Sequence, residues 1–179
     1  MQTSKQGKAE IASYEGASLT KYLDSVGVQT IGIGATVSEI PDIKQWAWDK
    51  ELTLEQVFDL FTESLVKYEN AVNKAVKVPL AQHQFDALVS ICYNIGTGGL
   101  SKSTFVKRIN NKESMPRIVD AIMMWDIPKE IIGRRRKEAK LFSTGVYSGN
   151  GTTTLFPVSP TSKLPLYRKG KQINCLQYL

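Results

Sequence analysis

Apolar residues recur at helical spacing in two long stretches of the chain. Over residues 54–75 they fall every three or four positions, which predicts a long amphipathic helix. Thr53 and Gln56 form a capping-box pattern at its start, which satisfies the first backbone N–H groups of a helix. Residues 81–95 are apolar around most of the helical circumference, so we expect them to form the buried central helix of a helical lobe.

Shorter helices are expected after the glycine-rich residues 96–99, which should end the central helix. Ser103 is placed to cap the first of them, and Pro116 suits the first turn of the second. A last helix should follow Pro128 and end near Gly145. A short apolar run is expected in the core: Met123, Met124 and Trp125.

The N-terminal part of the chain follows a different pattern. A helix is expected over residues 3–14, ending near Glu15, with Gly16 placed to cap it. From there to Thr36 the residues have a period-two character with a glycine turn, which predicts a small β-hairpin sheet.

Two segments have no periodic pattern. Residues 37–52 indicate an irregular connection, in which Trp46 and Trp48 either stack on sugar rings or, more simply, pack between lobes. Residues 148–179 contain prolines and threonine-rich runs. This C-terminal extension is an arm that packs back on the lobe, a flexible tail, or an appendage that binds a partner, and the sequence leaves these alternatives open.

Glu15 and Asp24 bring two carboxylates to the predicted hairpin region, and Thr30 adds a hydroxyl. Cleavage of a glycosidic bond requires such a set: a protonated carboxyl that donates to the leaving oxygen, and an ionised carboxylate on the other face of the sugar. Burial against apolar neighbours can keep a general acid protonated near neutral pH. The simpler alternative is that both carboxylates are solvated surface charges.

The residues around these side chains carry a specific resemblance. Glu15-Gly16, Tyr22-Leu23-Asp24 and the run GVQTIGIG from Gly27 resemble the active-site segment of the phage-type lysozymes, the endolysins of glycoside hydrolase family 24. The resemblance implies that Glu15 is the general acid. It implies that Asp24 positions the attacking water and stabilises positive charge on the sugar, and that Thr30 helps to hold the water. The chain departs from the family pattern at Ala35, where the family usually has a histidine that looks structural.

The resemblance continues through the helical part of the chain and covers about residues 8–147. The segments PLAQHQFDALVSICYNIG, LSKSTFVKRIN and RRRKEAKLFSTG look like successive landmarks of the lysozyme helical lobe. By position, the resemblance implies that Tyr93, Asn94 and Ser103 bind substrate. Helix packing and capping are the alternative roles of these three side chains.

Together the segments predict an α+β, lysozyme-like fold. A small lobe with a three-strand sheet is joined by a long helix to a mostly helical lobe, with the cleft between them. We expect a catalytic domain over residues 1–147, with the small lobe at about 10–52 and the helical lobe at about 76–147. Residues 148–179 form the C-terminal extension.

Composition limits the partners and cofactors. The 179 residues carry 23 Lys and Arg against 17 Asp and Glu, a net charge of +6 that suits a polyanionic partner. No nucleic acid is expected, because basic stretches interleaved with aromatic residues are absent, and the run Arg134 to Lys137 is most simply a solvated face paired with Glu138. One histidine and two cysteines form no ligand cluster, so neither a metal nor a cofactor is expected. The spacing of Cys92 and Cys175 does not decide whether they pair.

The resemblance implies a muramidase that hydrolyses the β-1,4 bond between N-acetylmuramic acid and N-acetylglucosamine in peptidoglycan. It implies inversion, for which the two carboxyl groups stand about 6.5–9.5 Å apart. The alternatives are a lytic transglycosylase, a virion-associated lysozyme of a tail or injection device, and a non-catalytic wall-binding module.

The sequence contains no apolar run of transmembrane or signal-peptide length. We therefore expect a soluble monomer in the host cytoplasm, which reaches the cell wall through a lesion made by a holin.

Overall fold

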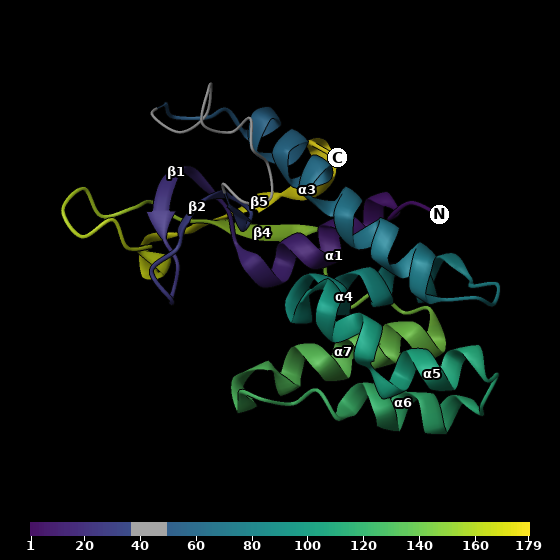
Figure 1. The fold of residues 1–179 in the computed structure, drawn as a ribbon. Coiled ribbons are helices and arrows are strands. Elements are labelled where there is room, and N and C mark those ends of the chain that lie inside the picture. Colours follow the sequence, from purple (N-terminus) through teal and green to yellow (C-terminus); the bar gives the residue numbers. More distant parts are fainter. Residues whose placement is uncertain (37–49) are drawn as a thin grey trace. The chain divides into compact units, whose positions relative to one another are not determined.

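The computed structural model describes residues 1–36 and 50–179 (Figure 1). Contacts divide the chain into two compact units. The helical unit comprises residues 1–7 and 65–148, and the β unit comprises residues 8–64 and 149–179. Trp46 and Trp48, for which sugar stacking or packing was predicted, lie outside the described residues.

The β unit is built on a small antiparallel sheet that follows helix α1 (Lys5–Glu15). Its strands, in the spatial order β1-β2-β3, are β1 (Ser18–Leu23), β2 (Gln29–Gly32) and β3 (Ala35–Thr36). Tyr22 lies opposite Thr30, which in turn lies opposite Thr36. The predicted hairpin sheet is thus confirmed, and its register places Thr30 on the central strand.

Gly16 ends helix α1, as predicted. Its φ of 75° lies in the left-handed region that favours glycine, and its N–H donates to the Ala12 carbonyl at 3.2 Å. A Cβ atom at this position would come within 3.0 Å of the Phe156 ring. Both the backbone and the packing therefore require glycine directly after Glu15.

The C-terminal extension folds onto the rest of the β unit. Its elements are β4 (Thr152–Leu155), the 3-10 helix η2 (Tyr167–Lys169), β5 (Lys171–Asn174) and the 3-10 helix η3 (Cys175–Gln177). Strands β4 and β5 pair antiparallel. The Ala17 N–H donates to the Thr154 carbonyl, and the Phe156 N–H donates to the Ala17 carbonyl, both at 2.9 Å. Of the three alternatives left open by the sequence, the structure selects the arm that packs back.

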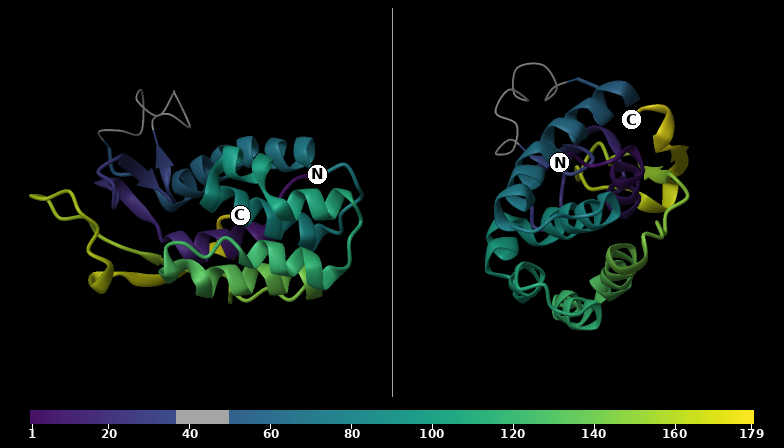
Figure 2. Two further views of the ribbon diagram at one scale, coloured as in Figure 1. Left: turned by 60° about the horizontal axis from the view of Figure 1, so that its bottom comes forward. Right: turned by 90° about the vertical axis from the view of Figure 1, so that its right-hand side faces the viewer.

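The helical unit contains the later helices of the chain (Figures 1 and 2). They are the second part of α3 (Leu54–Ala75), then α4 (Gln82–Lys102), α5 (Thr104–Asn110), α6 (Met115–Met123), the 3-10 helix η1 (Lys129–Ile131) and α7 (Ile132–Thr144). Helix α7 packs against both α4 and α6, and α6 packs against α5. The core residues of α4 include Phe85, Leu88 and Ile91, each fully buried.

Several predicted helix ends are confirmed. Helix α3 has the predicted bounds, and Thr53 and Gln56 form the reciprocal capping bonds at 3.0 and 3.3 Å. Ser103 caps α5, Pro116 lies in the first turn of α6, and Gly145 caps α7 with a left-handed backbone.

Two predictions about the helical unit were wrong. Helix α4 does not end at the glycines: Gly96 breaks the helical geometry with φ 77° and ψ 163°, but helical structure resumes and reaches Lys102. Met124 is not in the core, because α6 ends at Met123 and leaves the Met124 side chain 63% exposed beyond the buried face.

The interpretation of the basic run at residues 134–137 was partly wrong: Arg136 and Lys137 are exposed and Glu138 is paired as predicted, but the pair involves a buried arginine. Arg135 is fully buried and its partner Glu138 is 1% exposed, so this pair lies in the interior rather than on a solvated face. The reason is tertiary: polar groups from other segments of the helical unit surround the guanidinium, among them the Trp125 carbonyl and the Asn94 side chain.

Both cysteines are free and buried, so no disulfide joins Cys92 to Cys175. Burial raises the pKa of the Cys92 thiol to about 12 and that of the Cys175 thiol to about 11.

Among the helices that the structure describes, none combines the length and apolar character needed to cross a bilayer.

Candidate functional site

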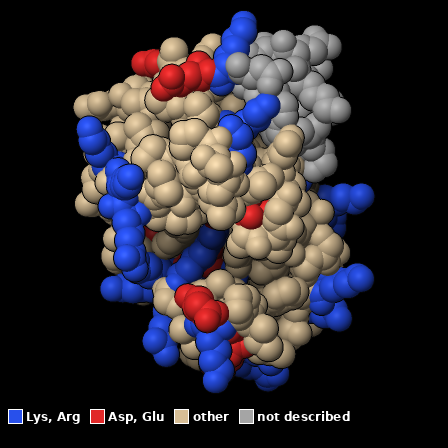
Figure 3. Space-filling view, turned by 90° about the vertical axis from the view of Figure 1, so that its left-hand side faces the viewer, with Lys and Arg blue, Asp and Glu red and all other residues tan. Residues whose placement is uncertain are grey.

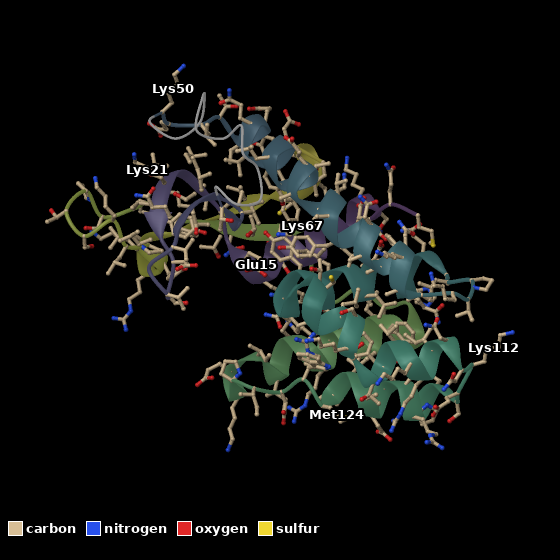
Figure 4. The ribbon with its side chains drawn as sticks, in the orientation of Figure 1. Glu15, Lys21, Lys50, Lys67, Lys112 and Met124 are labelled. Atoms are coloured by element: carbon tan, nitrogen blue, oxygen red, sulfur yellow. The ribbon has the colours of Figure 1, made fainter. Side chains whose placement is uncertain are left out.

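The two predicted catalytic carboxylates both belong to the β unit. Glu15 is the last residue of α1, and Asp24 directly follows strand β1. Both residues are partly buried. In Figure 4, Glu15 is labelled at the end of its helix.

Hydrogen bonds fix the Asp24 side chain within the β1–β2 turn. Its Oδ1 atom accepts from the backbone N–H groups of Val26 at 2.9 Å and Val28 at 2.8 Å. The backbone closes the same turn, because the Gly27 N–H donates to the Asp24 carbonyl at 3.1 Å. These bonds orient the carboxylate and use one of its oxygens, which leaves Oδ2 for a water molecule or a substrate.

Thr30 lies close to this turn. It is only 3% exposed, and its Oγ1 donates to the Val28 carbonyl at 3.2 Å. Val28 therefore links the two predicted site residues, since its N–H binds Asp24 and its carbonyl binds Thr30.

The charges of Glu15 and Asp24 both affect the pKa of two tyrosines, Tyr22 and Tyr167. Burial raises the pKa of Tyr22 above its usual value, and the charges of Tyr167, Glu15 and Asp24 raise it further. Burial likewise raises the pKa of Tyr167, followed by the charges of Glu15 and Asp24. Both phenols consequently remain protonated at neutral pH and are able to donate hydrogen bonds beside the carboxylates.

Sequence reasoning assigned no role to either tyrosine. Tyr22 was noted only as part of the motif that precedes Asp24, although its place opposite Thr30 could have been inferred from the hairpin register. Tyr167 lies in the extension, which has no periodic pattern, so no sequence signal connected it to the site.

The predicted substrate-binding residues belong to the helical unit. The Tyr93 ring lies 4.9 Å from that of Tyr68, and the exposed Asn94 accepts a hydrogen bond from the Arg135 guanidinium. Ser103 is 2% exposed. Its hydroxyl caps α5 by accepting from the Val106 N–H at 3.3 Å, and it donates to the Leu100 carbonyl at 2.7 Å. Packing and capping thus account for contacts of all three side chains, and their binding of substrate stays a prediction.

The described residues offer no metal site. In residues 1–36 and 50–179, no three His, Cys, Asp or Glu side chains are grouped so that they could hold an ion. The chemistry available at this site is accordingly that of carboxylates, a threonine hydroxyl and two phenols.

A family model described as phage lysozyme matches residues 12–139. The chain belongs to the phage lysozyme family. This phage-type lysozyme is 36% identical to the endolysin of Salmonella phage P22 over 146 residues, which make up 79% of this chain and 98% of that endolysin. The resemblance inferred from the sequence is confirmed.

Solved structures agree with this assignment. An endolysin from Escherichia coli O157:H7 phage FAHEc1 superposes with a TM-score of 0.72 at 34% identity, covering 83% of this chain and 98% of its own. The muramidase domain of SpmX from Asticcacaulis excentricus gives a TM-score of 0.69 at 30% identity and covers 80% and 98%. The predicted α+β lysozyme fold is confirmed, and the chain is a peptidoglycan-hydrolysing enzyme of the endolysin type. The family match ends before the C-terminal extension.

Proposed function

We propose that this phage-type lysozyme is a muramidase that hydrolyses the β-1,4 bond between N-acetylmuramic acid and N-acetylglucosamine with inversion. One observation carries the proposal: within one compact unit, the Phe156 ring packs both against Gly16, the residue after Glu15, and against Tyr22, two residues before Asp24. Two carboxyl groups at one site are what hydrolysis of a glycosidic bond requires.

In the proposed reaction, the Glu15 carboxyl donates its proton to the glycosidic oxygen as the bond to the anomeric carbon breaks. A water molecule attacks that carbon from the opposite face of the sugar, and its proton passes to the Asp24 carboxylate. The negative charge of Asp24 also stabilises the positive charge that develops on the sugar ring.

The hydrogen bonds of the turn support the role of Asp24. Because Val26 and Val28 hold Oδ1, the carboxylate keeps one orientation while Oδ2 can accept from the attacking water. The hydroxyl of Thr30, linked to the same turn through Val28, supplies a second polar group for that water. A fixed water position is the condition for inversion.

Product analysis tests this proposal. NMR spectra recorded immediately after cleavage of a peptidoglycan oligosaccharide should show the α-anomer of the new reducing end, and mass spectra should show the gain of one water. A β-anomer as the first product would contradict inversion. An anhydromuramic end would identify a lytic transglycosylase instead.

The proposal includes the route to the wall that the family resemblance implies, through a membrane lesion made by a holin. Expression inside the host should then lyse cells only when a holin is present. Lysis from within without any holin would contradict this part of the proposal.

A further inference from the structure

The C-terminal extension reaches the chain beside both carboxylates. The two residues after Glu15 contact the extension. Gly16 packs against the Phe156 ring, and Ala17 forms backbone hydrogen bonds with Thr154 and Phe156. The residue before Asp24 also contacts the extension: the Leu23 N–H donates to the Lys163 carbonyl at 2.8 Å. Residues outside the family match thus contact the chain next to both carboxylates.

An aromatic cluster places Tyr167 there. Phe156 is 2% exposed and lies edge-on to Tyr22, with the ring centroids 5.2 Å apart. The Tyr167 ring packs on the same Phe156 at 4.7 Å, yet Tyr167 remains 59% exposed. The buried Phe156 therefore holds an aromatic side chain in a fixed place while leaving much of its surface open.

We propose that Tyr167 contacts the glycan: its ring packs on a sugar next to the scissile bond, and its hydroxyl donates to a polar group of that sugar. An exposed aromatic ring with a polar end suits a sugar, which presents both C–H groups and hydroxyls. Because Phe156 orients the ring before the substrate arrives, binding orders few additional rotamers. This inference rests on the proposed function of Glu15 and Asp24.

Kinetics on soluble peptidoglycan fragments test the role of Tyr167. Tyr167→Ala should raise KM about tenfold with kcat changed far less, and Tyr167→Phe, which keeps the ring, should lie between Ala and wild type. Tyr178→Ala is the matched control, since this tyrosine of the extension packs on Phe58 at 5.4 Å. Thermal unfolding checks that each variant is folded.

An unchanged KM in folded Tyr167→Ala would overturn the inference. So would an equal rise in KM in Tyr178→Ala, because it would point to a general effect of disturbing the extension. The proposed function fails in a different way, through a wild type that cleaves no peptidoglycan or a Glu15→Gln variant that stays fully active.

A separate observation concerns a basic pocket on the β unit. Its volume is about 300 Å³, and the residues lining it include Lys21, Lys50 and Lys163, with Glu51 the acidic member. Lys21 belongs to β1, and Lys163 belongs to the extension. Lys and Arg side chains predominate over Asp and Glu on the molecular face drawn in Figure 3, and Figure 4 labels Lys21 and Lys50.

We infer that this basic pocket binds carboxylates of the peptide stem of peptidoglycan. Lys21 lies three residues before Asp24, a span of about 10 Å at the rise of a β-strand. A stem of three extended residues also spans about 10 Å. A stem attached to the muramic acid at the proposed cleavage site can therefore place its carboxylates among the lysines. This inference too rests on the proposed function.

The test compares two substrates: glycan strands with stems, and strands from which an amidase has removed the stems. Wild type should prefer the stem-bearing strands about threefold to tenfold in kcat/KM at low salt, as expected for a few exposed ion pairs. The triple variant Lys21→Gln, Lys50→Gln, Lys163→Gln should lose this preference while cleaving stripped strands like wild type.

Two comparisons make the result specific to the pocket and to charge. Lys102→Gln with Lys140→Gln, two exposed lysines of the helical unit, should keep the preference. Stems whose carboxylates have been converted to amides should be bound no better than stripped strands. A preference that survives in the triple variant, or that persists with amidated stems, would overturn the inference.

Discussion

Replacing Glu15 with Gln should lower the rate of peptidoglycan hydrolysis about 10²–10⁴-fold, the usual loss when a general acid is removed. Gln has the shape of Glu but cannot donate the proton that the leaving oxygen needs. The substitution lies at the end of α1, where the backbone N–H of Gly16 closes the last turn by donating to the Ala12 carbonyl. The fold should therefore survive. The measurement is the rate at which each protein clears chloroform-treated Gram-negative cells.

Glu63→Gln is the matched control. Glu63 is an exposed residue of α3 within the same unit, so its loss of charge should leave clearing unchanged. If Glu15→Gln clears cells as fast as wild type, the general acid lies elsewhere. If wild type itself clears none, a non-catalytic wall-binding module becomes the better account of the chain.

Local signals explain why much of the fold was predictable. The capping box at Thr53 and the apolar period after it lie within one helix, so the bounds of α3 follow from neighbouring residues alone. The same holds for Gly16, whose backbone conformation is a local requirement at the end of α1. Such features depend little on the rest of the chain.

The candidate site could be proposed from the sequence only where a motif marks it. Glu15, Asp24 and Thr30 are close in sequence, and the structure brings the charges of the first two to the same phenols. The extension offers no comparable signal, because β4 is a run of threonines ending in Leu155, and Leu155 bridges to Ala17 far away in the chain. Non-local pairing of this kind depends on side-chain packing, which a single sequence does not reveal.

The burial of Arg135 was missed for a related reason. A run of four basic residues is normally solvated, and only tertiary structure shows that Arg135 meets the Trp125 carbonyl at 3.0 Å together with Asn94 and Glu138. Burial lowers the pKa of Arg135, the Glu138 carboxylate acts in the opposite direction, and Arg134 lowers it further. The guanidinium thus depends on one counter-charge in the interior of the helical unit.

Glu138→Gln should consequently lower the free energy of unfolding by about 3–5 kcal/mol, as expected when a buried ion pair loses one partner. Both oxygens of the Glu138 carboxylate are engaged. Oε1 accepts from Ser90 at 2.6 Å and from Arg134 at 2.9 Å, and Oε2 accepts from Arg135. The amide of Gln would turn donor hydrogens toward one of these donors and would leave the Arg135 charge uncompensated. Urea unfolding followed by tryptophan fluorescence measures the loss.

Glu113→Gln is the comparison at a more exposed ion pair of the same unit. Glu113 pairs with Arg117 at 2.8 Å, but the two side chains are 24% and 65% exposed, so this substitution should cost no more than about 1 kcal/mol. Equal urea midpoints for Glu138→Gln and Glu113→Gln would show that burial of Arg135 adds nothing to the pair.

A double-mutant cycle separates the charge from the packing around it. Because Arg135→Met removes the charge that Glu138 balances, the combination of Arg135→Met with Glu138→Met should be less destabilising than the two single losses added together. The expected interaction energy is about 0.5–3 kcal/mol, the range for residues in direct contact. Strict additivity would mean that Arg135 and Glu138 do not stabilise the helical unit through each other. Arg135 would then act through Trp125 and Asn94, and Glu138 through Ser90.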